Sequence, residues 1–530
     1  MPRTMLWGMA FILSVVVLGC SSENDSSEPP ATPVPQGGGL VTPPPPEEGV
    51  VFGRLKDAKT KEPIGAAQIS VGNTTVATNE SGFFFTSLPP NQEHLLRMEA
   101  PGYARTSQRV KAQAGISTFV EFSLLPFGKT LKFDAATGAT ISSEGAEVVF
   151  SANSLNAEGE VTASLARLDA EKREQLAAFP GGFRTNTGEL LESFGALAIE
   201  VRDEKGALVN LKSGEVAQAT IPASANVPAG DIPLWTYDEE AGVWREEGKK
   251  LTGCQSGNCS AELPHLSWWN ADIVTETTCL TVCAVDVNDT PAVGISFEAT
   301  GVDYNGSSTA FGGTDGCACL AVRIQSEIEV MGVTSGGIVK SNRISTDTTP
   351  LSCGNPACAK LPAPLKVAAP KFQAILTWGA KPSDLDSHFT GPCPYADCTE
   401  ERFHVYYSDQ GSLFKAPFAY LDTDDTSSFG PEITSLAVCS AGIYRYSVYN
   451  YSGEDSGPLV DSEAKVLVIL PDGNIHTYAV PDSNPDKHRL WVVGELNCSG
   501  VACQCSWAPI NAFMPGESDS PHFHPGVAGP

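Results

Sequence analysis

Turn-forming residues divide this chain into short segments, and they limit its possible folds more than any other feature. The sequence holds 50 Gly and 39 Pro, and its apolar residues recur in short runs that alternate with polar ones. Such runs, bounded by Gly, Pro, Asn and Asp, predict β-strands. One segment, LDAEKREQLAAF over 168–179, has a helical pattern instead. We therefore expect an all-β chain.

The length predicts several domains. A chain of 530 residues is too long for one hydrophobic core, because single cores stop growing near about 250 to 300 residues. We expect tandem β-sandwich domains behind a signal peptide and a tether. The predicted segments are a signal peptide over 1–20, a Pro/Ser-rich tether over 21–49, β-domains over 50–126, 127–275, 276–370 and 371–498, and a Cys-containing, Pro/Gly-rich tail over 499–530.

The charge and the motifs argue against several functions. Lys and Arg number 34 against 62 Asp and Glu, for a net charge of −28, so the chain would repel a nucleic-acid backbone. Gly128, Lys129 and Thr130 lack the upstream glycine of a phosphate-binding loop, so no nucleotide is expected. A G-x-S-x-G elbow is also absent from the sequence. We expect a protein that is not an enzyme.

The N-terminus has the pattern of an export signal. Arg3 precedes the apolar run LWGMAFILSVVVL, which ends in VLGC at Cys20, and this pattern is typical of a secretory signal rather than a stable membrane span. VLGC resembles the bacterial lipobox, which implies cleavage before Cys20 and attachment of fatty acyl chains such as palmitate to it. The alternative is a signal peptide that happens to contain a cysteine. We expect a lipid anchor in the bacterial outer membrane, facing the periplasm or the exterior.

The segment over 21–49 is rich in Pro and poor in apolar residues. Such a composition cannot bury enough surface to fold. We expect it to hold the first domain away from the lipid surface as an extended tether.

The run WGAKPSDLDSHFTGP, over 378–392, is the most specific in the chain. Three side chains with acceptor atoms recur at every second position, which places them on one face of an extended strand. A second acidic run, LDTDDT, follows, and a histidine in RFHVYY lies between the two. The candidate metal ligands are Asp384, Asp386, His388, His404, Asp422, Asp424 and Asp425.

These residues have two interpretations. Asp is common in turns, where it bonds its own backbone, so the carboxylates can simply cap turns at the rim of a sandwich. Alternatively they bind a cation, which is Ca²⁺ or Mg²⁺ for oxygen ligands and Zn²⁺ or Mn²⁺ if His388 or His404 contributes. The carboxylates of Asp384 and Asp386 can share one ion with the second acidic run only if they lie within about 8 Å of a carboxylate oxygen of that run.

Two functions follow from these interpretations. We expect a non-enzymatic envelope module for adhesion, structure or binding, with an extracellular or envelope protein or a polysaccharide as its ligand. The alternative is a metal-dependent hydrolase, in which the cation lowers the pKa of a bound water, or a carbohydrate-binding protein that uses the C-terminal sandwich.

The cysteines indicate an oxidised compartment. Without Cys20, 14 of the 15 cysteines remain, and an even number in an exported chain predicts seven disulfides. Short loops favour three pairs, which are Cys254 with Cys259, Cys353 with Cys358, and Cys393 with Cys398. Pairing stays open in two groups, which are Cys279, Cys283, Cys317 and Cys319, and Cys439, Cys498, Cys503 and Cys505. In the first group, bonds between the CLTVC and CAC runs fit best.

Two segments resemble one known family. GRLKD, PIGAAQISV, ATNESGFFFTSLPP and APGYA, within 50–126, resemble the carboxypeptidase regulatory-like domain, a small transthyretin-type β-sandwich. The turns DVNDTPAVG and TDG, within 276–370, resemble a second, divergent copy. The resemblance implies an architecture and little chemistry.

The two other domains also show resemblances. FPGGFRTNTGELLESFGALAIEVRDEKGALVNL and LPHLSWWNAD, within 127–275, are similar to a β-rich region of bacterial surface lipoproteins and of the cartilage intermediate layer protein, which implies no activity. WGAKPSDLDSHFTGP, LDTDDTSSFGPE and GIYRYSVYNYSG resemble a bacterial β-sandwich domain of unknown function. Strand aromatics form a sugar platform if exposed, but more often form the core; the candidates are Trp235, Trp244, Trp268 and Trp269.

Overall fold

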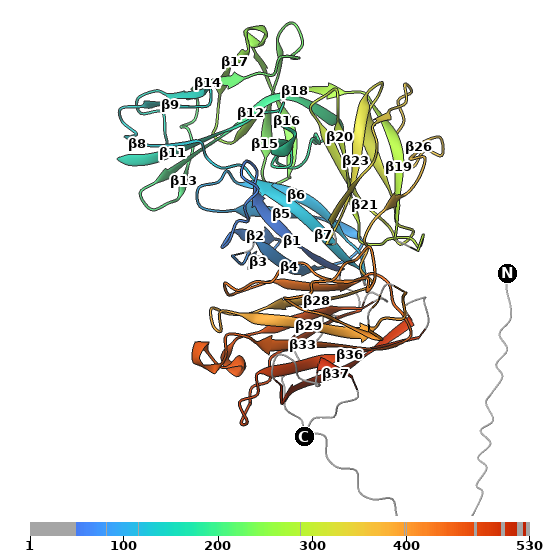
Figure 1. The fold of residues 1–530 in the computed structure, drawn as a ribbon. Helices are drawn as coiled ribbons and strands as arrows, with labels where there is room; N and C mark the ends of the chain where they lie inside the picture. The colour runs from blue at the N-terminus through green and yellow to red at the C-terminus, as the bar shows by residue number, and fades with distance from the viewer. Residues whose placement is uncertain are drawn as a thin grey trace, which may run out of the picture. The chain divides into compact units, whose positions relative to one another are not determined.

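The computed structural model describes residues 49–516, except 81, 115, 287, 336, 397, 399, 471–473 and 500–503, together with 523–525. The predicted signal peptide with Cys20, the tether up to residue 48, and Cys503 lie outside the described residues. Nearly every described element is a strand (Figure 1), which confirms the all-β prediction. None of the described helices is both long and apolar enough to cross a bilayer.

The first sandwich packs two sheets, ordered β4-β1-β7 and β3-β2-β5-β6. In the first sheet, β1 pairs antiparallel with β4 and parallel with β7. Apolar side chains from both sheets, including Val51, Ile69 and Leu96, form one core. The strands are β1 Gly49–Asp57, β2 Gln68–Val71, β3 Thr74–Ala77, β4 Phe83–Leu88, β5 Gln92–Glu99, β6 Thr106–Ala112 and β7 Ser117–Leu124.

A later sandwich repeats the main strand order of this topology. Its sheets are ordered β22-β19-β26 and β21-β20-β23-β24, and β19 pairs antiparallel with β22 and parallel with β26 and β27. This match supports the divergent second copy that the sequence suggested. The strands are β19 Thr277–Val285, β20 Ser296–Gly301, β21 Ser307–Phe311, β22 Cys317–Arg323, β23 Glu327–Thr334, β24 Gly337–Lys340, β25 Ile344–Ser345, β26 Ala359–Lys360 and β27 Leu365–Lys366.

The region between the two copies also forms two sheets, ordered β17-β14-β10-β9 and β16-β15-β18-β12-β11-β8, with β13 beside β12. Its elements are β8 Lys129–Asp134, β9 Ala139–Ser143, β10 Ala146–Phe150, β11 Glu160–Leu168, α1 Arg173–Leu176, β12 Leu190–Asp203, β13 Leu208–Val209, β14 Ala217–Pro222, β15 Ile232–Asp238, β16 Val243–Leu251, η1 Cys254–Ser256, β17 Asn258–Leu263 and β18 Trp268–Thr275.

Two expectations for this region are corrected. The predicted helix over 168–179 is wrong beyond the single turn of α1. Leu168 belongs to strand β11 and pairs with β12. The side chain of the buried Gln175 accepts a hydrogen bond from the N–H of Asp169. The sugar platform is also wrong, because every candidate ring is at most 4% exposed and packs in the core: Trp235, Trp244, Trp268 and Trp269.

The C-terminal sandwich packs two five-stranded sheets, ordered β31-β32-β28-β34-β35 and β30-β29-β33-β36-β37. Phe372, Phe389, Tyr444 and Trp491 are buried between them. The elements are β28 Phe372–Thr377, β29 Leu385–Pro392, β30 Arg402–Val405, β31 Ala419–Leu421, β32 Glu432–Leu436, β33 Gly442–Asn450, η2 Glu454–Ser456, η3 Leu459–Asp461, β34 Lys465–Ile469, β35 Ile475–Ala479, β36 Leu490–Ser499 and β37 Gln504–Met514.

The sandwich continues past residue 498, where the sequence analysis placed the start of the tail. The 11 residues of β37 pair with β36 along its length. Trp507 of β37 packs against the core and donates a hydrogen bond from Nε1 to the hydroxyl of Tyr478 at 2.9 Å. The Pro and Gly residues that dominate the tail's composition lie mostly after this strand.

Candidate cation site

Strand β29 presents its side chains as the period-2 pattern predicts. Leu385 and Phe389 point into the sandwich core and are fully buried. On the other face, Asp386 is followed by His388, whose ring stacks on Phe523 of the C-terminal segment with centroids 4.1 Å apart. Asp384 immediately precedes the strand and continues the same alternation.

Three carboxylates meet beside the start of β29. One oxygen each of Asp384, Asp386 and Asp424 lie within 4.8 Å of one another. Two ligand oxygens at about 2.4 Å from one calcium ion are at most about 4.8 Å apart, so these three can share an ion. The separation is well inside the limit that the sequence analysis set for a shared ion.

The two other acidic candidates have partners outside this cluster. The carboxylate of Asp422 lies 2.6 Å from the guanidinium of Arg54 on β1 and also accepts the N–H of Ile433 at 2.8 Å. Asp425 accepts both the N–H and the hydroxyl of Ser427 at 2.8 Å, which is the turn-capping role of an aspartate. The turn interpretation therefore describes Asp425, whereas Asp424 joins the cluster.

A residue that the sequence did not single out holds the two acidic runs together. Glu432 is fully buried in β32. Its carboxyl accepts the N–H of Ser387, between Asp386 and His388, at 2.6 Å, and the N–H of Asp425 at 3.3 Å. Burial raises the pKa of Glu432 well above its usual range. This side chain fixes the loop of Asp424 against the strand of Asp386.

The carboxylates of the cluster are buried close together and repel one another. Burial, followed by the charges of Asp386 and Asp424, raises the pKa of Asp384 to about 7. Burial and then Asp424 raise the pKa of Asp386 to about 7 as well. Among the described residues, one oxygen of each member is buried without a hydrogen-bond partner: Asp384 Oδ1, Asp386 Oδ2 and Asp424 Oδ1.

The two candidate histidines form a pair next to the cluster. His388 Nδ1 and His404 Nε2 are hydrogen-bonded at 2.8 Å. Burial lowers the pKa of each imidazole to about 3, so both are neutral and one donates to the other. The other nitrogen of His388, Nε2, lies 3.9 Å from Oδ2 of Asp386 and has no hydrogen-bond partner among the described residues. His404 thus contacts His388 rather than the carboxylates.

The disulfides follow the predictions in part. Cys254 is bonded to Cys259 and Cys393 to Cys398, as the short loops predicted, and Cys283 of β19 is bonded to Cys317 of β22 across the strands. Cys439 is disulfide-bonded, and one further bond joins β36 to β37: Cys498 to Cys505.

The predicted pairing of Cys353 with Cys358 is wrong. Cys358 is bonded to Cys279 of β19, and Cys353 is bonded to Cys319 of β22. The segment that carries both cysteines leads into β26, which pairs with β19, and each cysteine is bonded to a different strand. Closeness in sequence was misleading because the chain makes two turns in this segment and each cysteine lies beside a different strand.

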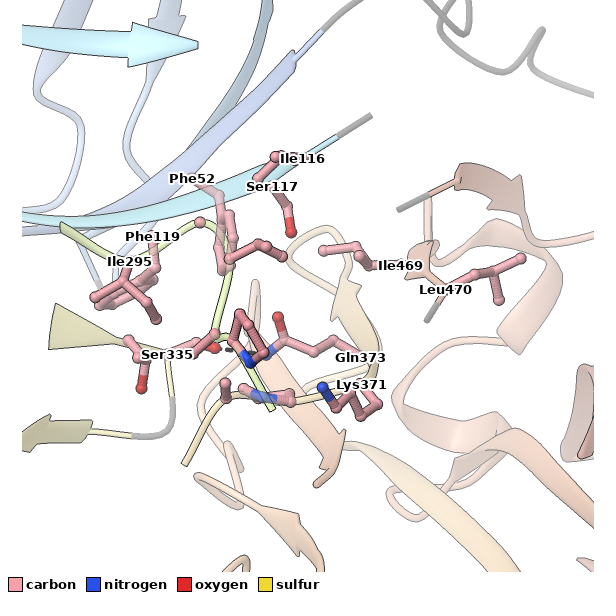
Figure 2. Close-up of a pocket in the computed structure, with 17 residues that line it drawn as sticks. Phe52, Ile116, Ser117, Phe119, Ile295, Ser335, Lys371, Gln373, Ile469 and Leu470 are labelled. Carbon is pink, nitrogen blue, oxygen red and sulfur yellow. Dashed lines mark hydrogen bonds between the residues drawn. The ribbon is translucent and has the colours of Figure 1, made fainter. Parts of the chain in front are cut away.

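A cavity of about 110 Å³ has walls that include Phe52, Phe119 and Ile469. Figure 2 shows these residues. Two of the cavity's polar side chains are already engaged. The amide of Gln373 donates to the hydroxyls of Ser335 at 2.7 Å and Ser435 at 3.0 Å, and Lys371 is ion-paired to the buried Asp286 at 2.7 Å. The cavity therefore offers packing between apolar side chains rather than a reactive site.

Comparison with protein families identifies the first sandwich. Residues 50–125 match the carboxypeptidase regulatory-like domain. The match covers β1 to β7 and less than half of the chain. It agrees with the resemblance of the motifs and with the observed fold of this part. No curated protein matches the chain significantly.

Solved structures show weak overall similarity. The TIE protein of Bacillus anthracis is 13% identical, with a TM-score of 0.15, and the similarity covers 60% of this chain and only about half, 51%, of that protein. The major pilin subunit BcpA of Bacillus cereus is 10% identical, with 60% and 99% of the two chains covered and a TM-score of 0.15. The major pilin SpaD of Corynebacterium diphtheriae is 10% identical, with 57% and 96% covered and a TM-score of 0.15. These values assign no function to the chain.

Proposed function

We propose that this chain is a lipid-anchored envelope protein whose C-terminal β-sandwich binds a divalent cation and acts as a binding module rather than as an enzyme. The cluster of Asp384, Asp386 and Asp424 carries this proposal. All three supply oxygen atoms, which favours calcium or magnesium. The VLGC run at Cys20 and the tether behind it support the lipid anchor.

The unpaired polar atoms support a cation in particular. A buried acceptor without a partner costs about 1–3 kcal/mol, and the cluster holds such an oxygen on each of its three carboxylates. Like charges this close repel each other. A divalent ion would satisfy the oxygens and cancel the repulsion at the same time.

The histidine pair supports a binding role over hydrolysis. A general base must reach the water that it activates. His388 is 1% exposed, is covered by Phe523 and is bonded to His404. His388 is therefore enclosed and does not face a substrate.

Calorimetric titration of CaCl₂ into the full chain, together with thermal denaturation with and without calcium, tests the proposal. A ligand that binds only the folded state raises Tm by mass action. Asp424→Asn should abolish both the heat of binding and the gain in Tm, because it removes one charged ligand. Asp424 is half-buried on a loop, so the variant should still fold.

Asp486→Asn is the matched control, because this aspartate is in the same sandwich and its side chain is 74% exposed. It should respond to calcium as the parent does. A parent chain that binds neither calcium nor magnesium would refute the cation site. Tighter binding of zinc than of calcium would instead place His388 among the ligands.

A further inference from the structure

Two exposed aromatic rings lie at the cation site. Tyr407 is 37% exposed and Tyr451 is 49% exposed, and their ring centroids are 5.5 Å apart. Large apolar rings on a surface commonly mark a binding site when polar groups converge beside them. The ring of Tyr407 also packs edge-on against that of Tyr406, with centroids 5.1 Å apart.

The sheet order places these rings over the acidic strand. Strand β29 lies between β30 and β33. Tyr407 follows the end of β30, and Tyr451 follows the end of β33. Because the two rings meet, they approach each other across the start of β29, where Asp384 and Asp386 lie.

Backbone contacts agree with this placement. Leu385 is paired with Asn450 in the ladder, which puts Asp384 opposite Tyr451. The hydroxyl of Ser452, the next residue, donates to the carbonyl of Asp384 at 3.2 Å. The pKa of Tyr407 is raised by desolvation first and then by neighbours that include Tyr451, Asp386 and Asp424.

An unpartnered side-chain nitrogen, outside the three carboxylates, points to a ligand independently. Nε2 of His388 has no hydrogen-bond partner among the described residues, although the side chain is only 1% exposed, and it is directed at Oδ2 of Asp386 from 3.9 Å. This imidazole nitrogen and this carboxylate oxygen face each other without a hydrogen bond. Such a pair of atoms is expected beside a bound cation, or beside a water bound to one.

We propose that the rings of Tyr407 and Tyr451 and a cation held by Asp384, Asp386 and Asp424 form one binding site for a glycan that presents two neighbouring hydroxyl groups. This inference rests on the proposed cation site and names its ligand. Calcium takes about six to eight oxygen ligands, so three carboxylates leave positions for other oxygens. Asp384 and Asp424 are half-buried, which leaves one side of the cluster open to solvent.

The size of the surface favours a sugar over a protein partner. The two hydroxyl oxygens of a vicinal diol fill adjacent positions on the ion, while the C–H face of the sugar ring packs on a tyrosine ring. Specific protein interfaces bury about 1,200 Å² or more in total. Two partly exposed tyrosine rings offer only roughly 200 Å², which suits one or two sugar units.

Retention of the purified full chain on mannan-agarose and on galactose-agarose tests the inference, since both sugars carry vicinal diols. We expect retention on at least one matrix in calcium buffer and elution by EDTA. Tyr407→Ala and Tyr451→Ala should lose retention and keep the full calcium-induced rise in Tm. Phe414→Ala is the control, because Phe414 is 64% exposed in the same sandwich and should be dispensable.

The outcomes separate this inference from the proposed function. A calcium-induced rise in Tm without retention on either matrix would overturn the glycan site and leave the cation site standing. Retention that survives EDTA would overturn the role of the cation in sugar binding. Calcium-dependent binding to casein-coated beads, but to neither sugar, would assign the surface to a protein partner. Loss of both the rise in Tm and retention would refute the two proposals together.

Discussion

The carboxyl of Glu432 accepts the backbone N–H of Ser387 at 2.6 Å, and this bond joins two strands of opposite sheets in the C-terminal sandwich. The same carboxyl accepts the N–H of Asp425 at 3.3 Å. One buried side chain therefore determines how far Asp424 lies from Asp386.

Glu432→Gln tests this positioning role. The amide retains one acceptor oxygen and loses the other, so the variant should lose about 1–3 kcal/mol of stability and bind calcium more weakly than the parent. Thermal denaturation and calorimetry measure the two effects. Glu463→Gln, at an exposed position of the same sandwich, should change neither. Unaltered calcium affinity in the Glu432 variant would show that the loop keeps its place without this bond.

Arg54→Ala should destabilise the acidic loop from the side of the first sandwich. It leaves Asp422, which is only 13% exposed at its side chain, without its ion-pair partner at 2.6 Å. Loss of a hydrogen bond to a charged group costs about 1.5–3 kcal/mol, so Tm should fall. Lys132→Ala is the control, since its pair with Glu160 is exposed on both sides and should contribute little. Equal effects of the two variants would contradict this difference.

Asp272→Asn should make the chain less sensitive to pH. Burial raises the pKa of Asp272 well above its usual range. The folded state then holds a proton that the unfolded chain, with an aspartate pKa near about 3.9, has released. Stability contributed by this group therefore falls as pH rises above about 4. The variant should melt above the parent at alkaline pH and close to it in acid, and parallel Tm profiles of the two proteins would show the prediction to be wrong.

Removing the disulfide between Cys319 and Cys353 should destabilise the second copy. The loss should be larger than the one caused by removing a disulfide that closes a short loop. The two cysteines are separated by 34 residues, and loops of this length are worth about 3–4 kcal/mol in the chain-entropy account. The double change Cys319→Ser and Cys353→Ser should lower the unfolding midpoint in denaturant. Cys254→Ser with Cys259→Ser, which opens a loop of only 5 residues, should have the smaller effect. The reverse order would contradict the entropic explanation.

Cys20→Ala should release the protein from membranes. If the sulfur of Cys20 carries the lipid, the variant has no anchor and belongs in the soluble fraction. Fractionation and uptake of labelled palmitate measure this directly. Ser21→Ala, beside it, should leave the anchor intact. A Cys20 variant that still sediments with membranes and takes up no label would show that something else holds the protein there.

Local pattern predicted the strands and the shared face of Asp384, Asp386 and His388 because a strand alternates its side chains whatever surrounds it. It did not predict the partners of those residues. Arg54 and Asp422 are 368 positions apart, Glu432 has the sequence context of an ordinary strand residue, and Phe523 lies in a segment whose composition indicates a tail. Nothing in a single sequence records such long-range contacts.

The same limit explains the cysteines and β37. Cys254 and Cys259 pair within one turn, so spacing was a sound guide. Cys353 and Cys358 lie on a segment of turns beside two strands, and only the fold brings each one to its partner. The alternation of Cys505, Trp507 and Phe513 in β37 was a usable signal, which the nearby Pro and Gly residues concealed.

The bonds of Cys279 with Cys358, Cys283 with Cys317 and Cys319 with Cys353 all fall inside the second copy of the repeated topology, whereas the first copy contains no cysteine. A pulling force along the chain would enter at Cys279 and leave at Cys358 through the covalent bond, and it would bypass the residues between them. The first copy, once unfolded by tension, would lengthen by roughly 3.3–3.6 Å for each residue released. The two copies share a topology but not an extensibility, and under mechanical load the second would act as a link of fixed length.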